Sequence, residues 1–268
     1  MAASATEHGD APVSDRSLRQ FFALTFVLAT PFWILGAASG VMLLPGLPIA
    51  ALMTVCPAAA ALILTAREGK AGALLARAVD WRRIPAKAWL LVALLTPVAI
   101  KTVSFFVLRM AGTAVPAPRI AILPSLILFL VFLVAALGEE IGWSGYATDP
   151  LRRRFGALGG GLILGAIWAV FHFVPLAQAH RSLGWVAWWS LGAVATRVIL
   201  VWLYANTGRS VFAAALYHAV VNLSWQLFPV HGSFEDPRVT GPVTALVAIL
   251  IVAVWGPRTL TRNRRTPA

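Results

Sequence analysis

Eight apolar runs, each close to twenty residues long, dominate this sequence of 268 residues. The runs cover residues 18–39, 43–66, 88–108, 121–147, 159–179, 184–206, 210–228 and 240–257. An α-helix rises about 1.5 Å per residue, so roughly twenty apolar residues are enough to cross the hydrocarbon core of a bilayer. Charged residues make up only 12% of the chain, which is about half of their share in soluble proteins. The sequence therefore predicts an all-α, polytopic transmembrane helical bundle with about eight spans.

The distribution of basic residues predicts how this bundle is oriented. The formal net charge is +12, but the basic side chains are scattered over short loops and tails, so no nucleic-acid partner is expected. Sixteen of the 22 basic residues fall in the tails and loops of one face, and four fall on the other face. Because cytoplasmic loops carry the excess of Lys and Arg, both termini are predicted to be cytoplasmic. The expected location is the bacterial cell membrane, as a multi-pass protein with the lipid bilayer as a partner.

No change in composition marks a second domain. We expect a disordered cytoplasmic N-terminal tail at residues 1–16, a transmembrane bundle at residues 17–257 and a basic cytoplasmic C-terminal tail at residues 258–268. The single cysteine, Cys56, lies in an apolar run and is expected to be a small core residue.

Two adjacent carboxylates, Glu139 and Glu140, lie inside the run at residues 121–147. The other eight acidic residues all lie in polar tails or between apolar runs. Because an ionised side chain is costly in the hydrocarbon region, intramembrane acids usually face a cavity and serve a function. Neighbouring residues of a helix point in different directions. One carboxylate is therefore expected to face a cavity, while the other packs against a neighbouring helix.

Two histidines, His172 and His218, also lie within apolar runs. Trp168 precedes His172 by four residues and Asn222 follows His218 by four, so each pair shares one face of its helix. A carboxylate such as Glu139 can activate water as a general base with the help of a histidine. A second histidine and an amide can stabilise the oxyanion that forms. We expect these groups to meet in one layer that is reachable from the cytoplasmic side.

Two other interpretations of the same residues remain open. Glu139, His172 and His218 could bind zinc, because two histidines and one glutamate form a known catalytic ligand set. No His-Glu-x-x-His segment is present, so the sequence has no local motif for such a site. The histidines and Asn222 could also be packing residues that form hydrogen bonds between helices.

Three segments, in this order, resemble the motifs of a known family: Glu139-Glu140-Ile-Gly-Trp-Ser-Gly-Tyr146, Trp168-x-x-x-His172 and His218-x-x-x-Asn222. The family is that of the CPBP intramembrane proteases, which includes the type II CAAX prenyl endopeptidases and the bacterial Abi, or bacteriocin-immunity, proteins. The resemblance covers residues 121–228, which would form a protease-like core. The order, the spacing and the helix placement of the motifs all agree with the family.

This resemblance implies an intramembrane endopeptidase that hydrolyses a peptide bond of a membrane-associated or prenylated-type substrate. By its motifs, Glu139 would activate water with His172, and Glu140 would be a supporting residue. His218 and Asn222 would form the oxyanion site. Family members are often labelled metalloproteases, although the glutamate and histidine arrangement can be argued to work without metal.

The sequence departs from the family motifs at two positions. Ser144 stands where the first motif usually has arginine, and Trp168 stands where the second usually has phenylalanine. The aromatic exchange is expected to be mild, but a cation near the carboxylates would help to fix their ionisation. Arg197 or Arg152 could supply that cation, and Ser144→Arg is expected to raise activity, while Lys101 is expected to pair locally.

Two further functions remain open, the first of them favoured by Ser144 in place of the usual arginine. A catalytically inactive relative could act as a bacteriocin-immunity or membrane scaffold protein. A proton-coupled transporter could use the two carboxylates as a relay. Internal repeats are typical of transporters, and none is found in this sequence.

Overall fold

The computed structural model describes residues 15–262, and over this range the chain is almost entirely helical. In chain order the elements are α1 (Asp15–Ser39), β1 (Met42–Leu44), β2 (Leu47–Pro48), η1 (Ile49–Val55), α2 (Cys56–Ala66), α3 (Ala71–Leu75), η2 (Ala76–Arg83), α4 (Ala88–Met110), α5 (Ile122–Gly142), η3 (Trp143–Ala147), α6 (Thr148–Phe171), α7 (Phe173–Gln178), α8 (Leu183–Asn206), α9 (Val211–Leu227) and α10 (Pro237–Trp255). The predicted all-helical fold class is confirmed, with one short antiparallel hairpin as the exception in the described range.

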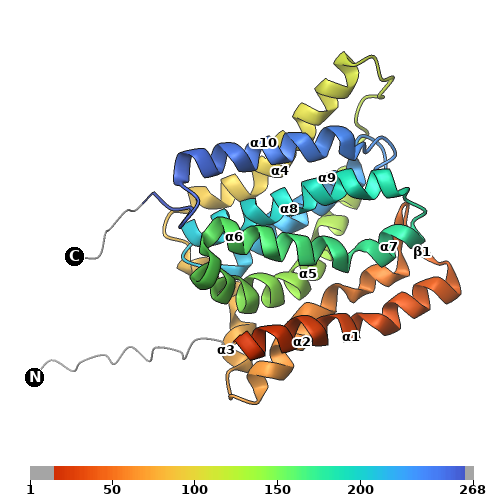
Figure 1. The fold of residues 1–268 in the computed structure, drawn as a ribbon. Coiled ribbons are helices and arrows are strands. Elements are labelled where there is room, and N and C mark those ends of the chain that lie inside the picture. Colours follow the sequence, from red (N-terminus) through yellow and green to blue (C-terminus); the bar gives the residue numbers. More distant parts are fainter. Residues whose placement is uncertain (1–14, 263–268) are drawn as a thin grey trace, which may run out of the picture.

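The helices form a bundle in which the long elements run side by side (Figure 1). Between residues 15 and 262, six segments are long and apolar enough to cross a membrane: Arg16–Ser39, Ile49–Ala66, Ala88–Met110, Ile122–Phe171, Leu183–Asn206 and Pro237–Trp255. The segment Ile122–Phe171 has 50 residues, and the chain turns within it at Gly156, which has a φ of 72°. This segment can therefore supply two passes, and the shorter apolar helix α9 supplies another. The total agrees with the predicted bundle of about eight spans.

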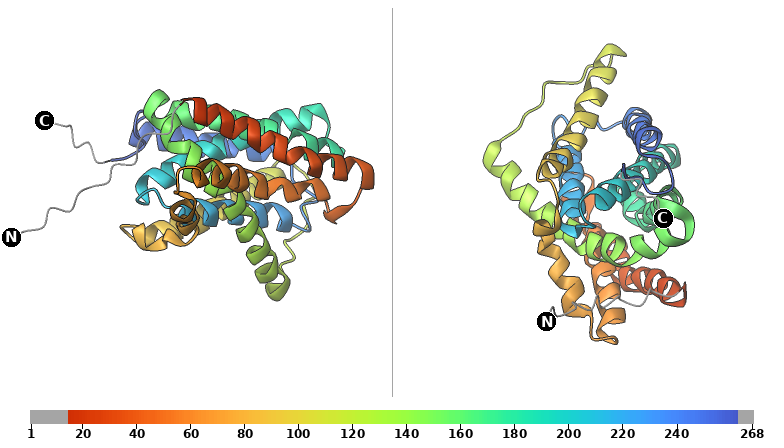
Figure 2. Two further views of the ribbon diagram at one scale, coloured as in Figure 1. Left: turned by 90° about the horizontal axis from the view of Figure 1, so that it is seen from below. Right: turned by 90° about the vertical axis from the view of Figure 1, so that its left-hand side faces the viewer.

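The beginning of α1 and the end of α10 lie at the same end of the bundle (Figures 1 and 2). We call this the terminal end, and we call the opposite end, which holds β1 and β2, the hairpin end. An even number of passes requires the two chain ends to lie on one side. The expected tails, residues 1–16 and 258–268, fall largely outside the described residues, and the cytoplasmic location of the terminal end stays a prediction.

The second span begins later than the sequence pattern suggested. Residues 43–66 were expected to cross the membrane as one helix, but residues 42–48 form the hairpin and the helical path begins at Ile49. Pro45 and Gly46 occupy the turn of the hairpin, and Gly46 has a φ of 73°, which a helix does not contain. The following loop is also more ordered than expected, because it contains α3 and η2.

The fifth span breaks at His172, as the position of Pro175 predicts. Proline has no N–H to donate to the carbonyl four residues earlier, so α6 ends at Phe171 and α7 begins at Phe173. The break places His172 between two helical segments. Close approach of the backbones helps to build the surrounding core: a Cβ at Gly165 would lie 2.9 Å from the Cα of Val194 on α8.

Candidate active site

The two carboxylates lie at the end of α5, where the helix widens into the π-helical turn η3. Glu139 is 1% exposed and Glu140 is fully buried. Adjacent helical residues diverge by about 100°, so the two side chains meet different neighbours. Glu139 points toward α6 and the α6–α7 break, whereas Glu140 contacts α8 and α9. Single π-helical turns are frequent at functional sites, and here one follows the carboxylates directly.

Glu139 is held by two indole groups and faces a histidine. Its Oε2 accepts hydrogen bonds from Trp168 Nε1 at 2.6 Å and from Trp143 Nε1 at 3.1 Å. Its Oε1 lies 3.9 Å from His172 Nε2, a separation that one water molecule can bridge with two hydrogen bonds. His172 Nδ1 lies 2.8 Å from the carbonyl oxygen of Trp168. A carbonyl only accepts, so Nδ1 carries the proton and the Nε2 of a neutral His172 is left as an acceptor beside Glu139.

Glu140 takes part in a separate, fully buried ion cluster. Arg197 Nη1 donates to both of its oxygens, at 2.9 and 2.8 Å, and His218 Nδ1 lies 3.0 Å from Oε1. The hydroxyl of Ser144 also donates to Glu140. Arg197 is therefore confirmed as the counter-ion of a glutamate, and α8 supplies the cation that position 144 lacks. Arg152, the other candidate, instead pairs with Asp149 at 3.3 Å.

Four of the expected site residues line one cavity of about 250 Å³: Glu139, His172, His218 and Asn222. Trp168 also lines it, whereas Glu140 and Arg197 lie behind its wall. The cavity extends to the hairpin end, where Gly46, Arg181 and Glu235 line it. We expected access from the cytoplasmic side, at the end that holds the chain termini. The lining residues lie toward the hairpin end instead, and which end faces the cytoplasm stays a prediction.

The orientation of the cavity can be measured with single cysteines and a membrane-impermeant maleimide. Ser233 lies exposed at the hairpin end and Arg67 lies exposed at the end of α2, near the terminal end. If the excess of basic residues marks the cytoplasmic face, Ser233→Cys should be labelled in intact cells and Arg67→Cys only after lysis. Both variants carry Cys56→Ala to remove the native thiol. The opposite pattern of labelling would invert the predicted topology and open the cavity to the cytoplasm.

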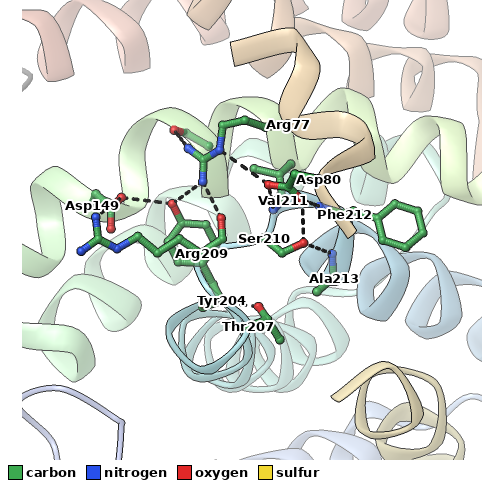
Figure 3. A network of polar contacts seen from close by, with 11 residues as sticks. Arg77, Asp80, Asp149, Tyr204, Thr207, Arg209, Ser210, Val211, Phe212 and Ala213 are labelled. Atoms are coloured by element: carbon green, nitrogen blue, oxygen red, sulfur yellow. Dashed lines mark hydrogen bonds and ion pairs between the residues drawn. The ribbon is translucent and has the colours of Figure 1, made fainter. Parts of the chain in front are cut away.

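A polar network centred on Arg77 fastens η2 to the turn that follows the carboxylates (Figure 3). Arg77 Nη1 donates to the carbonyl of Gly145 in η3 at 2.9 Å. Its Nη2 donates to the hydroxyl of Tyr204 at 2.8 Å and to the carbonyl of Arg209 at 2.6 Å. Tyr204 in turn donates to Asp149 at 3.1 Å. One partly buried guanidinium thus joins η2, η3 and the end of α8.

Asp80 in η2 fixes the beginning of α9, the helix that carries His218. Its carboxylate accepts hydrogen bonds from the hydroxyl of Ser210 at 2.6 Å and from the backbone N–H groups of Val211 and Phe212, both at 3.1 Å (Figure 3). A carboxylate at this position satisfies free N–H groups and interacts favourably with the helix dipole. Sequence reasoning missed Arg77 and Asp80. The one available signal was that Asp80 is one of only two acids in a strongly basic loop.

Replacing Arg77 by glutamine should destabilise the protein and disturb catalysis together. Three hydrogen bonds from a charged donor are lost, so we expect the free energy of unfolding to fall by about 2–3 kcal/mol. Arg82→Gln is the matched control, because Arg82 lies exposed in the same segment and its guanidinium lies over the ring of Trp81. Thermal unfolding in detergent measures both variants. Equal unfolding midpoints would contradict a fastening role for Arg77.

The structure also corrects the interpretation of Trp168. Its replacement of the usual phenylalanine was expected to be mild, but its indole makes the shorter of the two bonds to Glu139, which a phenyl ring cannot make. Trp143, which holds the same oxygen, was not predicted as a site residue. The signal for Trp143 was present in the sequence, because it follows Glu139 by four residues and so lies on the same helix face.

Trp168→Phe should lower kcat by about tenfold and leave KM nearly unchanged, because it removes a hydrogen bond to a charged acceptor. The ring packing against His172 and His218 can be kept by phenylalanine. Trp143→Phe, which removes the 3.1 Å bond to the same oxygen, provides the comparison. Full kcat in Trp168→Phe would show that this indole does not position the carboxylate.

The expected zinc ligands do not come together as a ligand set. Among residues 15–262, no three His, Cys, Asp or Glu side chains are grouped so that they could hold a metal ion. His218 turns its Nδ1 to Glu140, and Glu139 Oε2 is already bonded to two indole groups. The donor set therefore does not fit a zinc centre.

Comparisons with known proteins match the region that carries the three motifs. Residues 121–224 match a family model described as type II CAAX prenyl endopeptidase Rce1-like. CAAX prenyl protease 2 from Methanococcus maripaludis is 28% identical over 137 residues, which cover 47% of this chain and 49% of that protein. The chain thus spans about half the length of the curated relative that it matches. Together with the order and spacing of the motifs, these two matches support the placement of this chain in the CPBP family of CAAX proteases.

Proposed function

We propose that this chain is an intramembrane endopeptidase that hydrolyses a peptide bond of a membrane-associated, prenylated CAAX-type substrate. One observation carries the proposal: a buried carboxylate, Glu139, lines a cavity in which its free oxygen lies 3.9 Å from the Nε2 of His172. The family placement and the name of the relative agree with this chemistry. The substrate class rests on the similarity to these proteins alone.

In the proposed reaction, a water molecule lies between Glu139 Oε1 and His172 Nε2. Trp143 and Trp168 occupy Glu139 Oε2, so Oε1 is the oxygen available to take a proton from this water. His172 orients the water through the acceptor nitrogen that its bond to the Trp168 carbonyl leaves free. The resulting hydroxide attacks the carbonyl carbon of the scissile bond, and the proton held by Glu139 passes to the leaving amine.

His218 and Asn222 are proposed to stabilise the oxyanion. Both line the cavity, and Asn222 makes no side-chain hydrogen bond within the described range. In the proposed reaction His218 donates from Nε2 to the oxyanion, while its Nδ1 contacts Glu140 at 3.0 Å.

The ion cluster also bears on the alternative of an inactive relative. That alternative depended on the absence of arginine at position 144. Arg197 supplies a guanidinium at 2.8 Å from Glu140, so the carboxylates do not lack a cation. We therefore favour an active enzyme over a scaffold protein.

Cleavage of a defined peptide tests the proposal. The purified protein in detergent is incubated with a peptide that ends in a prenylated CAAX box, and with the same peptide without the prenyl group. Mass spectrometry should identify one cut near the C-terminus of the prenylated peptide, and His172→Gln should reduce this cleavage strongly. Absence of cleavage in the wild-type protein, or equal cleavage by His172→Gln, would overturn the proposed function.

A further inference from the structure

The charged residues that line the cavity are two cations, Lys101 and Arg181, and two anions, Glu139 and Glu235. Lys101 Nζ contacts Glu235 Oε2 at 2.5 Å, and Glu235 Oε1 accepts a hydrogen bond from Thr240 at 2.9 Å, so this pair is neutral and satisfied. Glu139 belongs to the proposed catalytic group. Arg181, in the α7–α8 loop, therefore leaves one positive charge without a negative partner at the hairpin end of the cavity.

Arg181 is held in place without using its hydrogen-bonding capacity. Within residues 15–262 no carboxylate lies at ion-pair distance from Arg181, and its guanidinium donates no hydrogen bond. The guanidinium stacks on the ring of Trp185, 4.7 Å from the ring centroid. It also lies against the turn of the hairpin, because a Cβ at Gly46 would come within 3.0 Å of Nη2. A guanidinium fixed by stacking keeps its planar donors ready for a carboxylate or a phosphate.

The distance from the proposed catalytic group to Arg181 fits a short extended peptide. Helix α7 begins directly after His172 and ends at Gln178, which corresponds to about 9 Å at 1.5 Å per residue. The chain then folds back, because the N–H of Arg181 donates to the carbonyl of Leu176. Three extended residues span about 10 Å. The cavity wall between these points is largely apolar and includes Leu176 and Trp189.

We propose that Arg181 binds the free C-terminal carboxylate of the substrate, about three residues beyond the scissile bond. The inference rests on the proposed function, and it adds the element that selects for a chain end. A CAAX box has three residues after its cysteine, the first two of them aliphatic, which suits both the spacing and the apolar wall. A lipid phosphate has the same charge chemistry, but the spacing along α7 favours the carboxylate.

Binding of two matched peptides tests this assignment. A prenylated peptide with a free C-terminal acid and the same peptide with a C-terminal amide are titrated into purified protein in detergent. The measurement is made in the Glu139→Gln background, in which the peptides stay intact. The acid should bind about ten- to hundredfold more tightly than the amide, because a bidentate bond to a charged group is lost in the amide. Arg181→Gln should abolish the difference, and Arg181→Lys should keep part of it.

Arg109→Gln is the matched control, because Arg109 lies at the end of α4 near the hairpin end, outside the cavity lining, with its guanidinium over Phe105. It should discriminate between acid and amide as well as the parent protein does. Equal binding of acid and amide by the parent, or unchanged discrimination in Arg181→Gln, would overturn the proposal. Displacement of both peptides alike by phosphatidylglycerol, without discrimination between them, would assign Arg181 to a lipid phosphate instead.

The outcome is independent of catalysis. Discrimination in binding without any cleavage by the wild-type protein would support the role of Arg181 and overturn the hydrolytic function. Cleavage of acid and amide with equal kcat/KM would support hydrolysis and overturn the role of Arg181.

Discussion

Replacing Glu139 by glutamine is expected to lower kcat by roughly 10²- to 10⁴-fold, the range that a general base contributes. The amide cannot take a proton from water, so the proposed activation step is lost. Its oxygen can still accept hydrogen bonds from the indole groups of Trp143 and Trp168. The unfolding midpoint and the affinity for an uncleaved substrate should therefore change little.

Glu140→Gln is the matched comparison one residue away. It leaves the guanidinium of Arg197 buried without its negative partner, and breaking a buried pair in this way costs about 3–5 kcal/mol. We therefore expect Glu140→Gln to lower the unfolding midpoint, whereas Glu139→Gln should lower kcat alone. Thermal unfolding and cleavage kinetics on the same preparations separate the two effects. If Glu139→Gln retained more than a tenth of wild-type kcat, Glu139 would not be the base.

Moving the buried cation between two positions should produce the second large effect. Arg197→Ser removes the only guanidinium that the described residues place on Glu140, at a cost of about 3–5 kcal/mol in the free energy of unfolding. Ser144→Arg alone adds a second guanidinium beside the first, where both would be buried. The structure therefore reverses the expectation from the sequence, because Ser144→Arg by itself should now destabilise the protein and reduce activity.

The double variant, Ser144→Arg with Arg197→Ser, should recover much of both losses, because one cation again faces Glu140. Residues in contact show coupling energies of about 0.5–3 kcal/mol, and we expect a value at the upper end, with favourable sign. The double-mutant cycle is measured by thermal unfolding and by kcat. A double variant that is as unstable as the sum of its single changes would show that positions 144 and 197 are not electrostatically equivalent.

The sequence by itself determined the helices and the spacing of polar groups along each of them. Apolar runs of about twenty residues leave the backbone only its own carbonyls as hydrogen-bond partners in a bilayer, and this requires helices. Local chemistry also determined the break at His172, because Pro175 lacks the N–H that would continue the helix. The four-residue spacing placed His218 and Asn222 together, and both line the cavity. The sequence also contained local signals that the predictions did not use. Trp143 follows Glu139 by four residues, and Pro45 with Gly46 marks the turn of the hairpin at residues 42–48.

Only the tertiary structure decided which groups meet across helices. The choice of Arg197 over Arg152 as the partner of Glu140 depends on how α8 packs against α6, where Gly165 lies against Val194 and Arg197. The packing of the helices also decided three other features. These are the hydrogen bond from Trp168 to Glu139, the orientation of His218 toward Glu140 and the extension of the cavity toward the hairpin end. Periodicity fixes the face of a helix on which a side chain lies. The neighbour that this face meets is set by the packing of the whole bundle, since ridges, close glycine contacts and buried charges must be satisfied together.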